Sequence, residues 1–331
     1  MNETVLEQLQ SLSASRRTVA IVGSMNADYT VVAQRLPAPG ETIEGGPLRI
    51  LPGGKSANQA ASAALLGSRV RMFGAVGADA NADFLLGRLA DAGVDTGEVL
   101  HVPGPSGTTV ITVDSHGENT IVYSPGSNAL VDAAYVEGHR GAIEAASVLG
   151  LCLESPMDAV LAAARVAHGA GVPVLLNDSP FVADLPAELV ELADILLVNE
   201  HEAAALLGVP SLAGFAEVGP DWDDVAVRMA RLGFSRVVIT LGGEGSMVID
   251  GAVRHRVAPV RVDARDTTGC GDAFMGTILA GLAAGYTLAQ SARMGSYVSA
   301  YAATGYGAQA SYGTAEQIAA RFAADAVPAE A

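Results

Sequence analysis

The sequence has few cysteines, few aromatic residues and little positive charge. Its two cysteines, Cys152 and Cys270, fit a reducing compartment and give no disulfide framework. Lys and Arg number 19 against 36 Asp and Glu, and the resulting net charge of −17 disfavours binding to nucleic acid or to an anionic membrane surface. No apolar run reaches the roughly 18 residues that a membrane-spanning helix needs. We therefore expect a cytoplasmic protein without nucleic-acid or membrane partners.

The length of 331 residues suits one large α/β domain with a small appendage. Residues 1–17 are polar and lack the apolar stretch of a signal peptide, so they are expected to form a flexible extension. Residues 326–331 are expected to form a tail. The six histidines show no zinc-binding spacing, and a zinc site is therefore not expected.

Strand-like and helix-like segments alternate along most of the chain, which predicts a parallel sheet covered by helices. The main expected strands are 18–22, 70–76, 147–153, 172–176, 195–198, 236–241 and 246–250. The main expected helices are 81–92, 157–169, 188–193, 273–284, 288–303 and 314–324.

Two segments, 28–53 and 107–125, break this pattern with short alternating strands. The first is interrupted by many Gly and Pro residues, and Ser115-His116-Gly117-Glu118 has the character of a hairpin turn in the second. We expect the two segments to form a small β-sheet that stands off the main domain. Such a sheet could act as a lid, as an association surface or as both. The α/β core then comprises residues 18–27, 54–106 and 126–325.

The stretch from Asp266 to Asp272 is the main candidate for a site. Its sequence, Asp-Thr-Thr-Gly-Cys-Gly-Asp, leads directly into an apolar helix. Backbone N–H groups at such a helix start lack intrahelical partners and lie at the positive end of the helix dipole, where an anion is favoured. A carboxylate there is expected to take a proton from a hydroxyl that attacks the anion, and this role falls to Asp272. A simple tight turn is the alternative.

Polar residues also follow several of the expected strands. Asn26 and Asp28 come after the first strand, and Glu154, Asn199 and Glu202 follow later ones. The carboxyl ends of parallel strands form the edge at which open α/β sheets bind ligands. Asn199 and Glu202 also have the spacing of a helix capping box, and Glu202 could equally hold a hydrated magnesium ion beside a triphosphate.

Two further glycine-rich turns allow a ligand to approach the backbone closely. Gly53-Gly54-Lys55-Ser56 precedes an Ala-rich helix, but Arg49 stands where a Walker A loop requires glycine. Gly242-Gly243-Glu244-Gly245 leads into a strand, so it is not a dinucleotide fingerprint, although it could admit a flat ring or a phosphate.

Six motifs in this order resemble those of the ribokinase-like carbohydrate kinases (the PfkB family) over residues 18–324. The motifs are GlySerMetAsnAlaAsp at 23–28, GlyGlyLysSerAlaAsnGlnAla at 53–60, LeuGluSerPro at 153–156, AsnGluHisGlu at 199–202, ThrLeuGly at 240–242 and AspThrThrGlyCysGlyAspAlaPhe at 266–274. The resemblance implies a three-layer α/β/α fold with a mainly parallel central sheet and a small β-sheet lid.

The resemblance also implies an ATP-dependent phosphotransferase with an alcohol group as acceptor. The expected reaction converts D-ribose to D-ribose 5-phosphate, with magnesium required and potassium activating. Another sugar or a nucleoside (deoxyribose, fructose or adenosine) is the alternative substrate. A catalytically silent sugar-binding protein is the alternative from a different class, although the intact Asp272 and glycine loop argue against it.

Site roles follow from the resemblance, residue by residue. The residues expected to hold sugar hydroxyls are Asn26, Asp28, Gly54, Asn58 and Glu154. Asp272 is the expected base, and the expected anion hole consists of the amides of Gly269, Cys270 and Gly271. The expected nucleotide-binding residues are Asn199, Thr240, Gly242 and Gly245, with Glu202 holding magnesium through water. The expected potassium ligands are Asp266, Thr268, Ala302, Gly305, Gly307 and Ser311.

Some positions depart from the pattern of the family. Ser56 replaces a common glycine, Cys270 replaces a common alanine, and Asn177-Asp178-Ser179-Pro180 differs from the usual motif on the nucleotide side. Cys270 could therefore make activity sensitive to thiol reagents. The two β-rich segments resemble those through which relatives dimerise, so a homodimer through the lid is expected.

Overall fold

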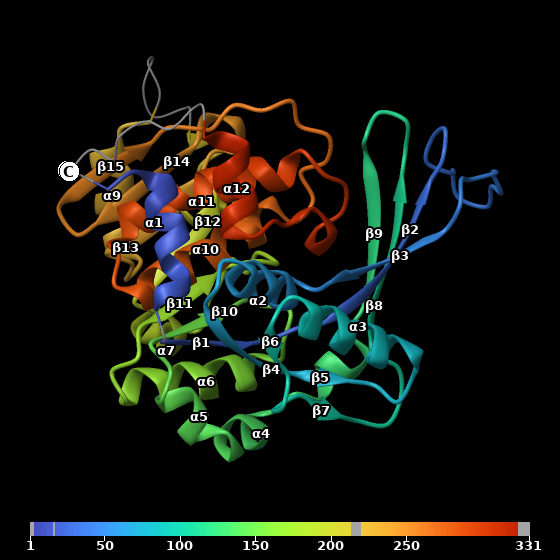
Figure 1. The fold of residues 1–331 in the computed structure, drawn as a ribbon, viewed down its shortest axis with the longest axis horizontal. Coiled ribbons are helices and arrows are strands. Elements are labelled where there is room, and N and C mark those ends of the chain that lie inside the picture. Colours follow the sequence, from blue (N-terminus) through green and yellow to red (C-terminus); the bar gives the residue numbers. More distant parts are fainter. Residues whose placement is uncertain (1–2, 16, 213–219, 324–331) are drawn as a thin grey trace.

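A nine-stranded sheet lies at the centre of the molecule (Figure 1). The structure is a computed structural model and describes residues 3–15, 17–212 and 220–323. Across the sheet the strands are β15 (Val253–Val257), β14 (Ser246–Asp250), β13 (Arg236–Thr240), β12 (Ile195–Asn199), β11 (Val174–Asn177), β10 (Val148–Leu151), β1 (Thr18–Val22), β4 (Arg69–Phe73) and β6 (Val94–Asp95). Neighbours from β13 to β6 pair in parallel, whereas β14 and β15 pair antiparallel. The mainly parallel sheet confirms the prediction.

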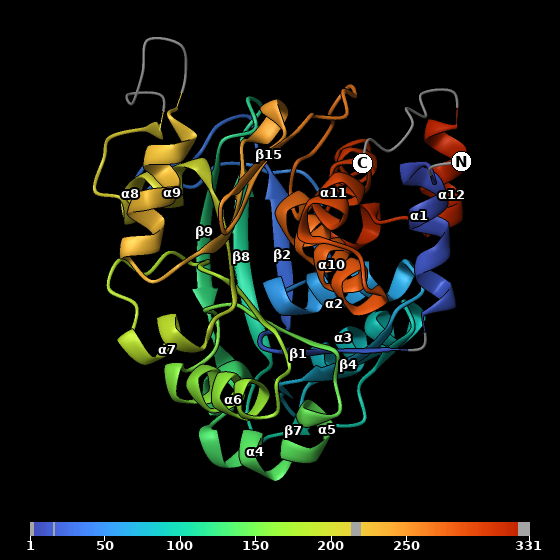
Figure 2. The same ribbon diagram turned by 90° about the vertical axis from the view of Figure 1, so that its left-hand side faces the viewer.

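Helices cover both faces of this sheet, as Figure 2 shows. One layer holds α1 (Val5–Ser11), α2 (Lys55–Leu65), α3 (Ala80–Asp91), α10 (Cys270–Ala284), α11 (Leu288–Ala303) and α12 (Ala315–Phe322). The other holds α4 (Ala133–Gly138), α5 (Arg140–Glu144), α6 (Met157–Gly169), α7 (Ala187–Leu192), α8 (Glu200–Leu206) and α9 (Trp222–Arg231). In β1, Val19 and Ile21 belong to the first core and Ala20 and Val22 to the second, as the alternation of a strand requires. The three-layer α/β/α fold is therefore confirmed.

Helix α10 is buried on nearly all sides and packs closely on α2. A Cβ atom at Gly276 would lie 2.5 Å from the carbonyl oxygen of Gln59 and 3.1 Å from the amide nitrogen of Ala63. Two helix backbones can approach to this distance only where no side chain stands between them. The contact fixes the N-terminal residues of α2 beside those of α10.

A separate four-stranded sheet stands away from the main body, on the right in Figure 1. Its strands are β3 (Arg49–Gly53), β2 (Asn26–Val32), β8 (Gly107–Val113) and β9 (Asn119–Ser124), in that order. β8 and β9 form the expected hairpin. Asn26 and Asp28 are the first and third residues of β2, so this strand starts two residues before the expected lid segment of residues 28–53.

The prediction of a flexible N-terminal extension is wrong for residues 3–15. Thr4 and Glu7 form a capping box at the start of α1, and the helix packs against α11 and α12. Leu9 and Leu12 are fully buried in the core. This short helix is stabilised by its buried apolar face and not by its own propensity. The expected tail at 326–331 lies outside the described residues.

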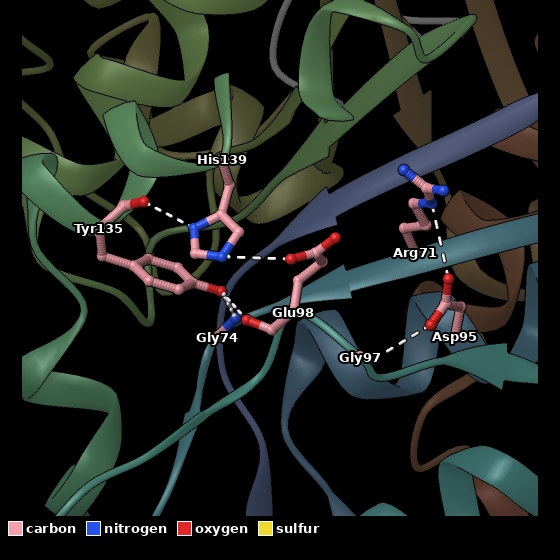
Figure 3. A network of polar contacts seen from close by, with 7 residues as sticks. All are labelled: Arg71, Gly74, Asp95, Gly97, Glu98, Tyr135 and His139. Carbon is pink, nitrogen blue, oxygen red and sulfur yellow. Dashed lines mark hydrogen bonds and ion pairs between the residues drawn. The ribbon is translucent and has the colours of Figure 1, made fainter. Parts of the chain in front are cut away.

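A polar network joins α4 to the loops that follow β4 and β6 (Figure 3). The Tyr135 hydroxyl accepts from the amide of Gly74 at 3.0 Å and donates to the carbonyl of Glu98 at 2.7 Å. His139 lies between two acceptors, with Nδ1 2.8 Å from the Tyr135 carbonyl and Nε2 3.2 Å from the Glu98 carboxylate. A Cβ at Gly74 would lie 2.5 Å from the carbonyl oxygen of Gly23, so the network supports the segment that leads into β2.

The described part of the chain contains no helix that is both long and apolar enough to cross a membrane. Both cysteines are free, and Cys152 is buried.

Candidate active site

The site begins at the N-terminus of α10. Gly269 caps this helix in the left-handed region, with φ of 75°, and a Cβ there would lie 2.5 Å from the Ala308 side chain. The Tyr312 hydroxyl donates to the Gly269 carbonyl at 2.7 Å and holds the turn. Only glycine suits this position, and the backbone of the turn is left open toward the cavity that Gly269 and Gly271 line.

Asp272 lies in the first turn of α10 and receives two hydrogen bonds from α2. The amide of Asn58 donates to Oδ2 at 2.9 Å, and the amide of Gln59 donates to Oδ1 at 3.2 Å. Burial raises the pKa of Asp272 to about 6, against the opposing effects of the Lys55 charge and the hydrogen bond from Asn58. The group is therefore ionised at neutral pH and close enough to its pKa to accept a proton.

Lys55 is the first residue of α2 and supplies positive charge to the site. Its amide donates to Oε2 of Glu154 at 3.0 Å. Although burial opposes the charge of the side chain, the carboxylates of Asp272 and Glu154 raise the pKa of Lys55. Lys55 is not among the expected site residues, because its loop fails the Walker A pattern.

The expected sugar-binding residues gather on the side of the site that faces the small sheet. The backbones of Gly53 and Gly54 lie against Asp28 and Asn26, since a Cβ at Gly54 would be 2.9 Å from the Asn26 amide nitrogen. Glu154 accepts from the hydroxyl of Ser24, and Asp28 accepts from that of Thr109. Burial raises the pKa of Asp28 to about 6, and the charges of Glu154 and Asp272 add to this shift. The carboxylates of Asp28, Glu154 and Asp272 therefore lie close to one another.

Asn128 is a fully buried residue that the sequence analysis did not single out. Its amide donates to Oδ1 of Asn26 at 2.8 Å. The side-chain oxygen of Asn26 is therefore engaged, whereas the NH₂ group of Asn26 can still donate to a ligand. No sequence motif could have identified Asn128, because it is 102 residues from its partner in the chain.

Two cavities adjoin the N-terminus of α10 on the other side. The smaller, of about 170 Å³, is lined by Lys55, Asn177, Ser179, Leu197, Val198, Asn199, Glu202, Thr240, Gly269, Gly271 and Asp272. The larger, of about 350 Å³, shares Thr240 and Gly271 with it and is mostly apolar. The larger cavity is also lined by Gly242, Gly245, Ser296 and Ala300. The structure therefore brings all four expected nucleotide-binding residues to two adjacent cavities.

Asn199 and Glu202 form the capping box that their spacing predicted. The Asn199 side chain accepts from the amides of His201 and Glu202, and Glu202 Oε2 accepts from the Asn199 amide at 2.8 Å. Both residues also line the smaller cavity, so capping and ligand binding are compatible here. A magnesium ion fits this position through water, because Mg²⁺ commonly keeps several waters and takes only one or two protein carboxylates.

The expected potassium ligands come from the loop before α10, the last turn of α11 and the loop that follows α11. The Asp266 carboxylate accepts from the amides of Thr268 at 2.9 Å and Gly307 at 2.8 Å. The amide of Gly305 donates to the Ala302 carbonyl, and a Cβ at Gly305 would be 2.6 Å from that of Ser311. All six residues thus lie close together. Their carboxylate, carbonyl and hydroxyl oxygens are ligands suited to a hard cation.

Cys270 is placed differently from the expectation for an anion hole. Its amide donates to the Thr267 carbonyl at 3.2 Å, and the residue lines the larger cavity. Burial raises the pKa of the Cys270 thiol to about 11, so the sulfur is protonated and weakly nucleophilic at neutral pH. Gly269 and Gly271, in contrast, line the smaller cavity beside Asp272.

Comparison with known proteins agrees with this arrangement. Residues 16–315 match the pfkB family carbohydrate kinases. A ribokinase from Haemophilus influenzae is 33% identical over 307 residues, covering 91% of this chain and 97% of the relative. A deoxyribokinase from Salmonella typhi is 29% identical over 303 residues, covering 90% and 96%. The structure of Arabidopsis thaliana ribokinase complexed with ribose and ATP matches with a TM-score of 0.83 at 28% identity, covering 92% and 97%. The chain therefore belongs to the pfkB family of carbohydrate kinases and is a phosphotransferase that acts on a sugar hydroxyl.

Proposed function

We propose that this chain transfers the γ-phosphoryl group of ATP to the 5-hydroxyl of D-ribose. The observation that carries the proposal is the position of Asp272. It lies at the N-terminus of α10, near the carboxylates of Asp28 and Glu154, and it also lines the smaller of the two adjacent cavities. A group in this place can reach both a sugar hydroxyl and the phosphoryl group that the hydroxyl attacks.

The proposed reaction begins with the sugar hydroxyl beside Asp272. As the hydroxyl oxygen bonds to the γ-phosphorus, its proton passes to the Asp272 carboxylate and the bond from phosphorus to the leaving ADP oxygen breaks. The open amides of Gly269 and Gly271 and the charge of Lys55 stabilise the negative charge on the transferring group. In this proposal Cys270 contributes to the shape of the nucleotide cavity and its amide plays a smaller part.

In this proposal the nucleotide occupies the two adjacent cavities. The adenosine part lies in the larger cavity with Gly242 and Gly245, and the phosphates extend past Thr240 and Asn199 toward Asp272. Glu202 holds a hydrated magnesium ion, which neutralises phosphate charge. Asp266, Thr268, Ala302, Gly305, Gly307 and Ser311 hold a potassium ion, whose charge would stabilise the loop before α10.

Ribose is favoured over a nucleoside by the polar character of the sugar side. Asn26, Asp28, Asn58 and Glu154 offer hydrogen-bonding groups to a free polyhydroxylated sugar, with Gly54 giving close backbone contact. The deoxyribokinase relative makes 2-deoxyribose the main competing substrate. Fructose and adenosine are the next candidates to test.

We also infer a cytoplasmic homodimer in which the small sheet, residues 28–53 and 107–125, serves both as lid and as interface. Apolar side chains are unusually exposed on this sheet. Those with at least 45% exposure are Val32, Leu48, Ile50, Val110, Ile121 and Val122. Exposed apolar groups gathered on one small sheet are typical of an association surface.

A coupled assay of ADP release over ribose, deoxyribose, fructose and adenosine, with and without potassium, tests the proposal. Turnover with ribose at the highest kcat/KM is expected, and no turnover with ribose would refute it. Asp272→Asn is expected to lower kcat by about 10²–10⁴-fold while calorimetry still detects ribose binding. If the wild-type chain binds ribose but turns over no substrate, the silent sugar-binding alternative is correct.

A further inference from the structure

Gln309 connects a distant loop to the proposed catalytic base through a second amide. It begins the short 3-10 turn Gln309–Ser311, which follows α11. Its Nε2 donates to Oδ1 of Asn58 at 3.0 Å, and Nδ2 of Asn58 donates to Oδ2 of Asp272 at 2.9 Å. The side-chain amides of Gln309 and Asn58 therefore form a chain of two hydrogen bonds from this loop to the Asp272 carboxylate.

The direction of both hydrogen bonds is fixed by chemistry. The ionised carboxylate of Asp272 can only accept, so Asn58 must turn its NH₂ group toward it. The oxygen of Asn58 then faces Gln309, which must supply a donor. A residue without a donor at position 309 would leave the Asn58 oxygen unpaired in a nearly buried place, since Asn58 is only 6% exposed.

We propose that Gln309 is a positioning residue, which holds the Asn58 amide in the orientation that donates to Asp272. The proposal rests on the proposed function of Asp272 as the base. Gln309 lies between Gly307 and Ser311, so the shape of this loop is transmitted to the base through two hydrogen bonds. Gln309 itself need not touch the sugar or the nucleotide.

Other groups near Asp272 must be kept constant when this idea is tested. The titratable groups that interact with its carboxylate are Lys55, Glu154, Asp28, Cys270 and Tyr312. Gln59 donates to the second carboxylate oxygen. Loss of the donor from Asn58 leaves all these groups in place, and it removes one of the interactions that favour the ionised form of Asp272.

Two variants separate the contributions of hydrogen bonding and charge. Gln309→Met keeps the length and neutrality of the side chain but removes its donor. Gln309→Glu places an acceptor opposite the Asn58 oxygen and so favours rotation of the Asn58 amide away from its present orientation. Gln10→Glu, on the exposed end of α1, is the control for a change of net charge.

The expected result is an upward shift of the acidic limb of the kcat/KM profile by about one pH unit in Gln309→Met. A larger shift is expected in Gln309→Glu and none in Gln10→Glu. A shift confined to Gln309→Glu would be a direct effect of charge and would overturn the proposal. Gln309 is partly exposed, so both variants are expected to fold and unfold thermally like the wild type.

A measurement without substrate keeps this test independent of the proposed reaction. The carboxyl carbons of ¹³C-labelled Asp can be titrated by NMR, with Asp272→Asn used to assign the resonance of Asp272. The same upward shift is expected in Gln309→Met, and an unchanged titration would overturn the positioning role. If the titration shifts but ribose is not phosphorylated, the proposed function fails and the positioning of Asp272 by Gln309 stands.

Discussion

The side chain of Asn128 hydrogen-bonds to both backbone polar groups of Met25. Its Oδ1 accepts from the Met25 amide at 3.1 Å, and its Nδ2 donates to the Met25 carbonyl at 3.2 Å. The same Nδ2 donates to the side chain of Asn26. One buried amide thus fixes both the backbone and the side chain at the start of β2, where the sugar is proposed to bind.

Asn128→Ala is expected to weaken sugar binding and destabilise the fold. The substitution leaves the buried polar groups of Met25 and Asn26 without partners, which costs about 2–4 kcal/mol of unfolding free energy. The KM for ribose is expected to rise about tenfold as Asn26 loses its fixed orientation. Urea unfolding and steady-state kinetics measure the two effects. Asn119→Ala, at an exposed position of β9, is the control and should change neither.

Asp178→Asn is expected to stabilise the protein at alkaline pH. Asp178 is fully buried, and burial raises its pKa to about 6, with the charge of Glu202 adding to the shift. The protonated form therefore favours folding, and this stabilisation is complete below about pH 4 and lost as pH rises through 6. The variant should exceed the wild type at pH 8 by at most about 3 kcal/mol, because one pKa unit corresponds to about 1.4 kcal/mol.

The gain in Asp178→Asn should shrink as pH falls from 8 to 4. Urea unfolding at a series of pH values measures it. A variant whose advantage is the same at every pH would show that the buried carboxyl is not ionised at pH 8.

Ser296→Phe is expected to impair nucleotide binding alone. Ser296 lies on α11 and lines the larger cavity, which a phenyl ring would partly fill. The KM for ATP should rise about tenfold or more, whereas the affinity for ribose measured by calorimetry should be unchanged. An equal loss of affinity for both ligands would place the nucleotide elsewhere.

Leu9→Ala is expected to destabilise the fold without changing the kinetics. Leu9 is fully buried where α1 packs on the helical layer, so the substitution should cost about 2–5 kcal/mol. Leu232→Ala is the matched control because Leu232 is 42% exposed. Denaturant unfolding measures the loss of unfolding free energy in the two variants. An equally small loss in both would show that the N-terminal segment is flexible.

Val122→Glu is expected to convert the proposed dimer into monomers. Val122 is 67% exposed on β9, and a carboxylate there would have to be desolvated in an interface. Val253→Glu introduces the same change at a residue that is 59% exposed on β15, outside the small sheet. Light scattering should give a monomer for the first and a dimer for the second. A dimer for both would exclude the small sheet as the interface.

Sequence patterns predicted those features that depend on residues close together in the chain. The strand at Thr18–Val22 and the helix at Met157–Gly169 follow from local apolar runs, caps and glycines. The helix expected at 273–284 is also present, although α10 begins three residues earlier, at Cys270. The motifs also identified several of the residues that line the two cavities, among them Asn199, Thr240 and Asp272. Helix α1 was missed because so short a helix depends on tertiary packing for its stability.

The support of the site could not be predicted in the same way. Asn128 and Asn26 are 102 residues apart, and Gln309 and Asn58 are 251 residues apart. Contacts of this kind arise from the topology, which places β2 beside β8 and brings the loop after α11 next to α2. A single sequence contains no local signal of such pairs.

The close contact at Gly276 has a consequence for protein engineering. Because the backbones of α2 and α10 touch there, Lys55, Asn58 and Asp272 keep their mutual positions as one preassembled unit. Asn26, Asp28 and Gly53 of the small sheet lie against the start of this unit, whereas the rest of that sheet stands away from the main body (Figure 1). Libraries that seek new acceptor sugars should therefore diversify the remaining positions of β2, β3 and β8, and leave the paired helices and these three residues unchanged.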